Sequence, residues 1–382
     1  MSDQEIVAPN LAALHTRHSS KWRRFDADVL PMHVAEMDFQ IAEPIRNRIV
    51  TMVTESDLGY LGPIPEVGKA FEGFAKRRWG WQIDSKQLRL ATDVGVAVVE
   101  FLRANGVAGG KVIINSPVYH GFWEWLGELA ITPVDVPLIA NHELDLAGIE
   151  REFAAGTKFL LLCNPHNPVG KTFSREQLTE LAAIARRHNA VVISDEIHAP
   201  LTYADQDFVP YLSCGEDAEA TGVCISSSSK SWNLAGLKAA FLLTQSATMA
   251  NLISRMPEAT HWRSSIIGAF AMVEAYENGE TWLDSTVEVL NENRHLLASE
   301  LAKRFPAVKY ELPNAGYLAW LDVSSWGLGE NTVAKLVAEG RISLVPGNDH
   351  GPEYTNFVRL NFGTSREHLL EGLDRIQSVV GK

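Results

Sequence analysis

The chain has few cysteines and no long apolar run. Among its 382 residues are three cysteines, Cys163, Cys214 and Cys224. Their spacing fits neither a metal-binding pattern nor a disulfide framework, which favours a reducing, cytoplasmic setting. No apolar run has the roughly 20 residues that a membrane helix needs. The acidic N-terminus MSDQEIVAPN also lacks the apolar core of a signal peptide, so we expect neither export nor a membrane partner.

Positive charge is scarce as well. The net charge of −13 argues against a nucleic-acid or membrane-surface partner, because such proteins normally carry a basic face. The stretch Gly170–Thr172 resembles the end of a nucleotide-binding loop, but Pro165 stands where that loop needs its first glycine. His33, His166 and His198 do not have metal-ligand spacing. We therefore expect neither a nucleotide nor a metal.

What the chain does have is a regular alternation of short apolar runs and helical patterns. Hydrophobic residues make up 46% and charged residues 21%, as in an ordinary globular protein. Residues 111–115, 158–163, 190–194 and 222–226 are typical of buried strands. Between the second and third of these strands, Ser174 and Gln177 predict a capping box that opens a helix. The alternation predicts an α/β fold with a mainly parallel sheet between helices.

The pattern changes after about residue 245, where longer helical stretches begin. Two further strands are predicted within 317–323 and 356–362. We predict a large domain of residues 42–285. A smaller α/β domain would combine an irregular N-terminal arm, residues 1–41, with residues 286–382.

Polar or aromatic residues follow each of the four buried strands. They are Tyr119, Asn167, Asp195 and Lys230, in chain order. Because function collects at the carboxyl ends of strands in an open parallel sheet, we expect these side chains to meet. A lysine that bonds to a carbonyl compound is most often one that holds pyridoxal phosphate (PLP). Asp195 would keep its ring nitrogen protonated, Tyr119 would stack on the ring, and Asn167 would face the ring hydroxyl.

The phosphate of that cofactor also needs partners. Ser227 and Ser229 beside the lysine supply hydroxyls, and Gly95 opens a helix whose free N–H groups suit an anion. Each of these residues alone has a commoner explanation. A lysine after serines is usually solvated, an aspartate after a strand usually caps a turn, and a lone tyrosine is usually half-buried packing. The prediction depends on the whole set.

Three motifs carry a family resemblance. NPHNPVGK, SDEIHAPL and SSSSKSWNLAGLK, in this order and spacing, resemble fold-type I PLP enzymes of the class I/II aminotransferase family. The resemblance runs from about Lys21 to the C-terminus. It implies an aspartate aminotransferase-like fold with a seven-stranded sheet. Within the family, DEIH and the stretch Lys21–Phe39 are similar to the cystathionine β-lyase, or cysteine-S-conjugate lyase, branch. Many true aminotransferases have tyrosine in place of His198.

The resemblance also implies roles for individual residues. Arg359 would bind the substrate carboxylate, and Tyr60 would reach the phosphate in a neighbouring subunit, which requires a homodimer with shared sites. The residues implied for catalysis are Lys230, Tyr119 and Tyr60. Those implied for cofactor binding are Lys230, Asp195, Asn167, Tyr119, Val94, Gly95, Val96, Ser227, Ser229, His198, Tyr60 and Lys238, and those for substrate binding are Arg359 and Asn167.

Three positions depart from the family pattern. Lys238 stands where many aminotransferases have a phosphate-binding arginine, so a point charge replaces a planar fork. His33 and Glu36 stand where related lyases often have tryptophan and aspartate. The last two positions bear on substrate preference and leave the cofactor prediction as it is.

The function expected from the resemblance is β-elimination from an amino acid with a sulfur leaving group, such as L-cystathionine. An aminotransferase that uses the same first steps is the alternative. A PLP-binding regulatory protein with little turnover is a remote third, because no appended DNA-binding motif is evident in the sequence.

Overall fold

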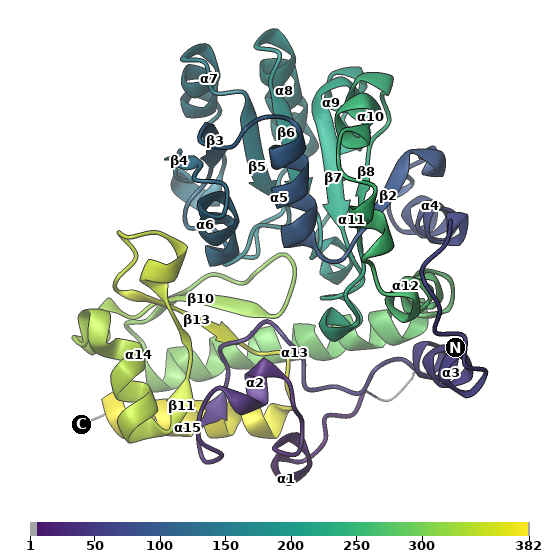
Figure 1. Cartoon of the computed structure of the whole chain (residues 1–382). Coiled ribbons are helices and arrows are strands. Elements are labelled where there is room, and N and C mark those ends of the chain that lie inside the picture. Colours follow the sequence, from purple (N-terminus) through teal and green to yellow (C-terminus); the bar gives the residue numbers. More distant parts are fainter. Residues whose placement is uncertain (1–5, 381–382) are drawn as a thin grey trace.

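A computed structural model describes residues 6–380. A seven-stranded sheet in the order β2-β8-β7-β6-β5-β3-β4 forms its centre (Figure 1). The strands from β7 to β4 pair in parallel, whereas β8 is antiparallel to both its neighbours. The strands are β2 (Leu88–Ala91), β3 (Lys111–Ile114), β4 (Thr132–Asp135), β5 (Phe159–Cys163), β6 (Val191–Asp195), β7 (Gly222–Ser226) and β8 (Ala240–Leu243). The predicted α/β fold is confirmed.

Both faces of this sheet are buried. Successive side chains on a strand point to opposite faces and therefore enter different cores. In β5, Leu160 and Leu162 join one apolar core, while Leu161 and Cys163 join the other. Helices α5 (Val94–Ala104), α6 (His120–Gly127) and α10 (Ala247–Ser254) cover the second face. The first face is covered by α4 (Pro65–Trp79), α7 (Leu146–Ala154), α8 (Arg175–Arg187) and α12 (Ile266–Asn278). The shorter α9 (Glu216–Thr221) and α11 (Ala259–Trp262), and α3 (Glu43–Thr54), complete this part.

The start of α8 shows how local sequence sets an element boundary. The Oγ of Ser174 accepts the N–H of Gln177 at 3.2 Å, which confirms the predicted N-cap. A capping box also needs the Gln177 side chain to accept the backbone N–H of Ser174. This part of the prediction is wrong, because Oε1 of Gln177 has no hydrogen-bond partner in the described chain.

The C-terminal part contains a second, antiparallel sheet in the order β12-β13-β10-β9. Its strands are β9 (Lys309–Tyr310), β10 (Leu318–Asp322), β12 (Val345–Pro346) and β13 (Phe357–Asn361). Its helices are α13 (Glu280–Arg304), α14 (Thr332–Lys335) and α15 (Arg366–Val380). The N-terminal arm is not wholly irregular. It contains α1 (Leu11–Leu14), α2 (Ser20–Arg23) and β1 (Leu30–Pro31), and β1 pairs in parallel with β11 (Ile342–Ser343).

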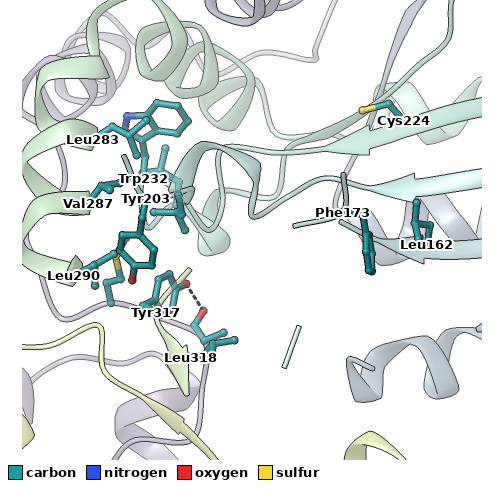
Figure 2. Packing of buried hydrophobic residues seen from close by; sticks show 14 of the residues in the cluster. Leu162, Phe173, Tyr203, Cys224, Trp232, Leu283, Val287, Leu290, Tyr317 and Leu318 are labelled. Atoms are coloured by element: carbon teal, nitrogen blue, oxygen red, sulfur yellow. Dashed lines mark hydrogen bonds between the residues drawn. The ribbon is translucent and has the colours of Figure 1, made fainter. Parts of the chain in front are cut away.

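Helix α13 links the two parts of the molecule. Figure 2 shows Leu283, Val287 and Leu290 along one side of this helix, near the aromatic rings of Trp232 and Tyr317, and all five belong to one buried core. The predicted boundary between residues 285 and 286 falls inside α13, and the division into domains stays a prediction. Among the described residues, no helix combines the length and apolarity needed to cross a membrane.

Candidate active site

A cavity of about 460 Å³ lies at the carboxyl ends of β5, β6 and β7. The start of α5, the N-terminal arm and β13 close its other sides. Most of the residues implied by the sequence line it, although they come from distant parts of the chain. They are Val94, Gly95, Tyr119, Asn167, Asp195, His198, Ser229, Lys230, Lys238 and Arg359.

Three of the implied residues do not line this cavity. Ser227 is buried behind Ser229, where its Oγ contacts the Ser229 Oγ at 2.7 Å and donates to the carbonyl of Ala239 at 2.6 Å. It therefore holds Ser229 in place. Val96 is exposed and Tyr60 is 98% exposed, and neither lines the cavity.

Asp195, the last residue of β6, is a buried carboxylate without a cationic partner. Its Oδ1 accepts the N–H of Ile197 at 3.2 Å, and no lysine, arginine or histidine of the described chain lies within ion-pair distance. Burial raises the pKa of Asp195 to about 7, although the Ile197 N–H and the charge of Lys230 act to lower it. A cationic ring nitrogen in the cavity would restore the ionised form.

Lys230 follows β7 and faces Asp195 across the same cavity. Its Nζ donates to the carbonyl oxygen of Ala35 in the N-terminal arm at 2.9 Å. Burial, helped by the positive charge of Arg359, lowers the pKa of Lys230 to about 8, against the opposing effect of Glu36 and Asp195. A large part of this amine is therefore neutral near pH 8, as a nucleophile or a base must be.

Arg359 lies in β13 and is a buried cation without an anion. Its guanidinium donates to Oδ1 of Asn167 at 3.1 Å and to the carbonyl oxygen of His33 at 3.1 Å, and it contacts Nε2 of His350 at 3.3 Å. Its Nε has no partner within the described residues, and burial lowers the pKa of Arg359 to about 10. A buried unpaired charge is costly, so this group is suited to a carboxylate ligand, which can accept two parallel hydrogen bonds.

The opposite end of the cavity can receive an anion at the start of α5. Asp93 caps this helix by accepting the N–H of Val96 at 2.8 Å, and its other oxygen lies 3.1 Å from Nζ of Lys238. The N–H groups of the first turn, with Ser229 nearby, suit a phosphate. Gly95 is required here, because a Cβ at this position would lie 2.5 Å from Nε1 of Trp125.

Sequence reasoning missed several residues that line the cavity, namely Arg24, His120, Trp125 and Asp349. The aromatic run after β3, SPVYHGFWEW, carried a signal for His120 and Trp125, because it follows a predicted strand. Arg24 directly follows α2, and Asp349 lies in a short turn after β12. Neither belongs to a periodic pattern, so no sequence signal pointed to them.

Comparison with known proteins identifies the family. Residues 54–376 match the family model for aminotransferase class I and II. The chain belongs to this family. It is 36% identical to a cystathionine β-lyase of Corynebacterium glutamicum over 376 residues, which cover 97% of this chain and 99% of that protein.

Solved structures of this aminotransferase family agree with that assignment. A protein of Corynebacterium diphtheriae assigned as a PLP-dependent β-cystathionase is 30% identical, with a TM-score of 0.94 over 99% of this chain and all of that one. A PLP-bound C–S lyase of Staphylococcus hominis is 25% identical, with a TM-score of 0.88 over 93% of this chain and 92% of that one. The predicted family and fold are confirmed.

The residues present also fit the cofactor of this family. PLP carries a ring nitrogen that needs a carboxylate, an aldehyde that needs an amine, and a phosphate. One cavity holds a residue for each need. Asp195 is a carboxylate without a cationic partner in the described chain, Lys230 is an amine that is partly neutral near pH 8, and Gly95 lies at a helix start. Tyr119 lies at the wall, with its ring in edge contact with Trp125 at 5.6 Å between centroids.

Proposed function

We propose that this chain is a PLP-dependent carbon–sulfur β-lyase. It would convert L-cystathionine, or a related cysteine S-conjugate, and water to a thiol, pyruvate and ammonia. One observation carries the proposal. The buried Arg359, which has no carboxylate partner in the described structure, shares a cavity with Lys230 and the equally unpaired Asp195. The identity with a cystathionine β-lyase over nearly the whole chain favours elimination over amino transfer.

Arg359 and Asn167 would bind the substrate carboxylate. The guanidinium presents a planar fork, and Asn167 already fixes one of its nitrogens at 3.1 Å. A carboxylate at this fork would compensate the buried positive charge, because it satisfies the unpaired Nε. Holding this group places the substrate Cα on the side of the cavity that Lys230 faces.

Lys230 would take the proton from Cα. Its pKa of about 8 leaves a large share of the amine neutral, and so able to accept a proton, near pH 8. PLP supplies an electron sink for the charge left on Cα. Asp195 would pair with the ring nitrogen of the cofactor, and Tyr119 would pack against its ring, since both side chains line the cavity. Once Cα has lost its proton, a thiolate on Cβ is a good leaving group.

The N-terminal arm would exclude water from these steps. Its backbone is held by side chains of the site, because Arg359 donates to the carbonyl of His33 and Lys230 to that of Ala35. A buried ion pair between Lys21 and Asp38, at 2.7 Å, links two points of the same segment. The arm therefore forms one wall of the cavity.

A homodimer with shared sites is the proposed active unit. Tyr60 is 98% exposed, and exposed apolar side chains lie nearby on α3 and the segment after it, namely Val50, Val53 and Leu58. His261 contacts the carbonyl of Gly62 at 3.2 Å, and its neighbour Trp262 is also exposed. An apolar surface of this kind favours self-association. A fully active monomer in light scattering would overturn this part of the proposal.

We also propose a cytoplasmic location. All three cysteines are free and buried, and thiols persist in a reducing compartment. Fractionation of cells that express the native protein would test this, and recovery outside the cytoplasm would contradict it.

The experiment that tests the function is product analysis. Purified protein is incubated with PLP and L-cystathionine, without any oxo acid. We expect homocysteine, pyruvate and ammonia in equal amounts, and none of them with Lys230→Ala. Pyruvate formation no faster than in the blank would refute the lyase proposal.

A further inference from the structure

Two oppositely charged, exposed side chains line the cavity. Arg24 directly follows α2, and Asp349 lies in the turn after β12. Throughout residues 6–380, neither side chain makes an ion pair or a hydrogen bond, although Arg24 lies over the ring of Phe25 at 5.9 Å. Charged side chains that line a pocket without an ion pair can bind a ligand of opposite charge.

Arg24, Asp349, His33 and His120 line the same cavity. Burial, and after it the positive charge of Arg24, lowers the pKa of His33 to about 4. Burial is also the main reason that the pKa of His120 falls to about 4, and Arg24 contributes less there than other cations of the site. Burial raises the pKa of Asp349, whereas Arg359 and Arg24 act to lower it.

His33 and His120 line the cavity with neutral rings that are only partly satisfied. Nδ1 of His33 contacts Oγ of Ser343 at 2.7 Å, whereas Nε2 has no partner. Nδ1 of His120 also lacks a partner in the structure as described. His33 is 4% exposed, and a buried polar atom without a partner indicates a ligand or a water at that point.

We propose that Arg24, Asp349, His33 and His120 form a distal subsite that binds a second amino-acid end of the substrate. The inference rests on the proposed lyase function and specifies its substrate class. Arg359 binds the carboxylate next to the reacting Cα. Arg24 pairs with the carboxylate at the far end of the leaving group, and Asp349 pairs with the far ammonium group. His33 and His120 hydrogen-bond to these distal groups through their unpartnered ring nitrogens. A thioether with two amino-acid ends is therefore preferred over an alkyl conjugate.

Four substrates separate the two contacts. L-Cystathionine carries both distal charges, S-propyl-L-cysteine carries neither, and the S-carboxypropyl and S-aminopropyl analogues carry one each. The value of kcat/KM for each is measured with the wild type, Arg24→Ala and Asp349→Asn. Arg23→Ala and Glu353→Gln are matched controls, because these charged neighbours do not line the cavity.

We expect Arg24→Ala to lower the preference for cystathionine over the propyl analogue about tenfold, as for loss of one charged hydrogen bond. It should affect the carboxypropyl substrate and spare the aminopropyl one, and Asp349→Asn should show the reverse. The controls should keep the wild-type preference. Equal losses on all four substrates, or no loss, would overturn the subsite.

Binding separates this inference from the lyase function. Dissociation constants for the same four compounds are measured by calorimetry in the Lys230→Ala background, which cannot turn over. If the wild type makes no pyruvate but the binding preference for two-ended compounds holds and depends on Arg24 and Asp349, the lyase function fails and the subsite stands. If pyruvate forms but the four compounds bind alike, the subsite fails.

Discussion

The guanidinium of Arg359 donates to Oδ1 of Asn167 at 3.1 Å, and both side chains are buried. The bond links a strand of the C-terminal sheet to the segment that follows β5 in the central sheet. One end of this pair would face the substrate carboxylate and the other the cofactor ring. The pair thereby fixes the substrate relative to the cofactor.

Replacing Arg359 should weaken substrate binding strongly. We expect Arg359→Ala to raise the free energy of the bound substrate by about 2–5 kcal/mol, because the carboxylate would be buried without a partner. Arg359→Lys should rescue only part of this loss, since an ammonium group cannot make two parallel bonds. Steady-state kinetics should show the effect mainly in KM. An unchanged KM in a folded Arg359→Ala protein would remove this residue from the substrate site.

Asp195 should destabilise the cofactor-free protein at neutral pH. The pKa of Asp195 is raised from 3.8 to about 7. Between these two pH values the folded chain therefore holds a proton that the unfolded chain has lost. Stability from this group is therefore present at low pH and is lost as the pH rises toward 7. We expect Asp195→Asn to make the cofactor-free protein more stable at pH 8, by about 1–3 kcal/mol, with little change at pH 4.

Urea unfolding at both pH values, with and without PLP, measures this effect. Added PLP should stabilise the wild type more than Asp195→Asn, because only the carboxylate pairs with the ring nitrogen. A variant that is less stable than the wild type at pH 8 without PLP, or equally stabilised by PLP, would contradict the role given to Asp195.

The amine of Lys230 should react with the cofactor at an unusually low pH. Burial lowers the pKa of this lysine to about 8, so the neutral amine is half-formed there. The rate at which cofactor-free protein becomes yellow on mixing with PLP should rise with pH and level off above about 8. A free lysine side chain has a pKa of about 10.4 and serves as the reference. A midpoint near that of the reference would show that Lys230 is solvated.

Gly95 should be needed for cofactor affinity. A Cβ there would lie 2.5 Å from Nε1 of Trp125, which forces the ring or the helix start to move. We expect Gly95→Ala to raise the dissociation constant of PLP about tenfold or more, the cost of a strained contact. Trp125→Phe should restore part of the affinity in the double variant. Gly127→Ala is the control, because its added Cβ would meet open space, and equal affinities for all these variants would exclude the clash.

Much of the fold could be predicted because buried parallel strands have an obvious sequence pattern. The runs that form β3, β5, β6 and β7 are almost wholly apolar and end at turn residues. Strands β2, β4 and β8 of the central sheet were not predicted. β2 is only partly buried at its first two residues, and β4 begins at an exposed Thr132 followed by a proline. Such edge strands depend on their neighbours for stability and leave little pattern of their own. β8 differs, because its four residues are all apolar and buried and therefore did carry the pattern of a buried strand.

The candidate site was predictable to the extent that its residues follow strands. Asn167, Asp195 and Lys230 line one cavity because parallel strands end at one edge. The arm and the C-terminal turn could not be placed in this way. Arg24 precedes β1 and Asp349 follows β12, and the pairing of β1 with β11 joins segments more than three hundred residues apart. Ser227, which was expected to bind the phosphate, does not line the cavity and instead contacts Ser229 and the carbonyl of Ala239.

The most direct test of the account is the fate of L-cystathionine when both routes are open. The protein is incubated with PLP, L-cystathionine and 2-oxoglutarate in one vessel, and pyruvate and glutamate are measured over time. We predict that pyruvate and homocysteine form at the same rate with or without 2-oxoglutarate, and that glutamate stays at the blank level. Glutamate formation without pyruvate would show an aminotransferase and contradict the lyase function.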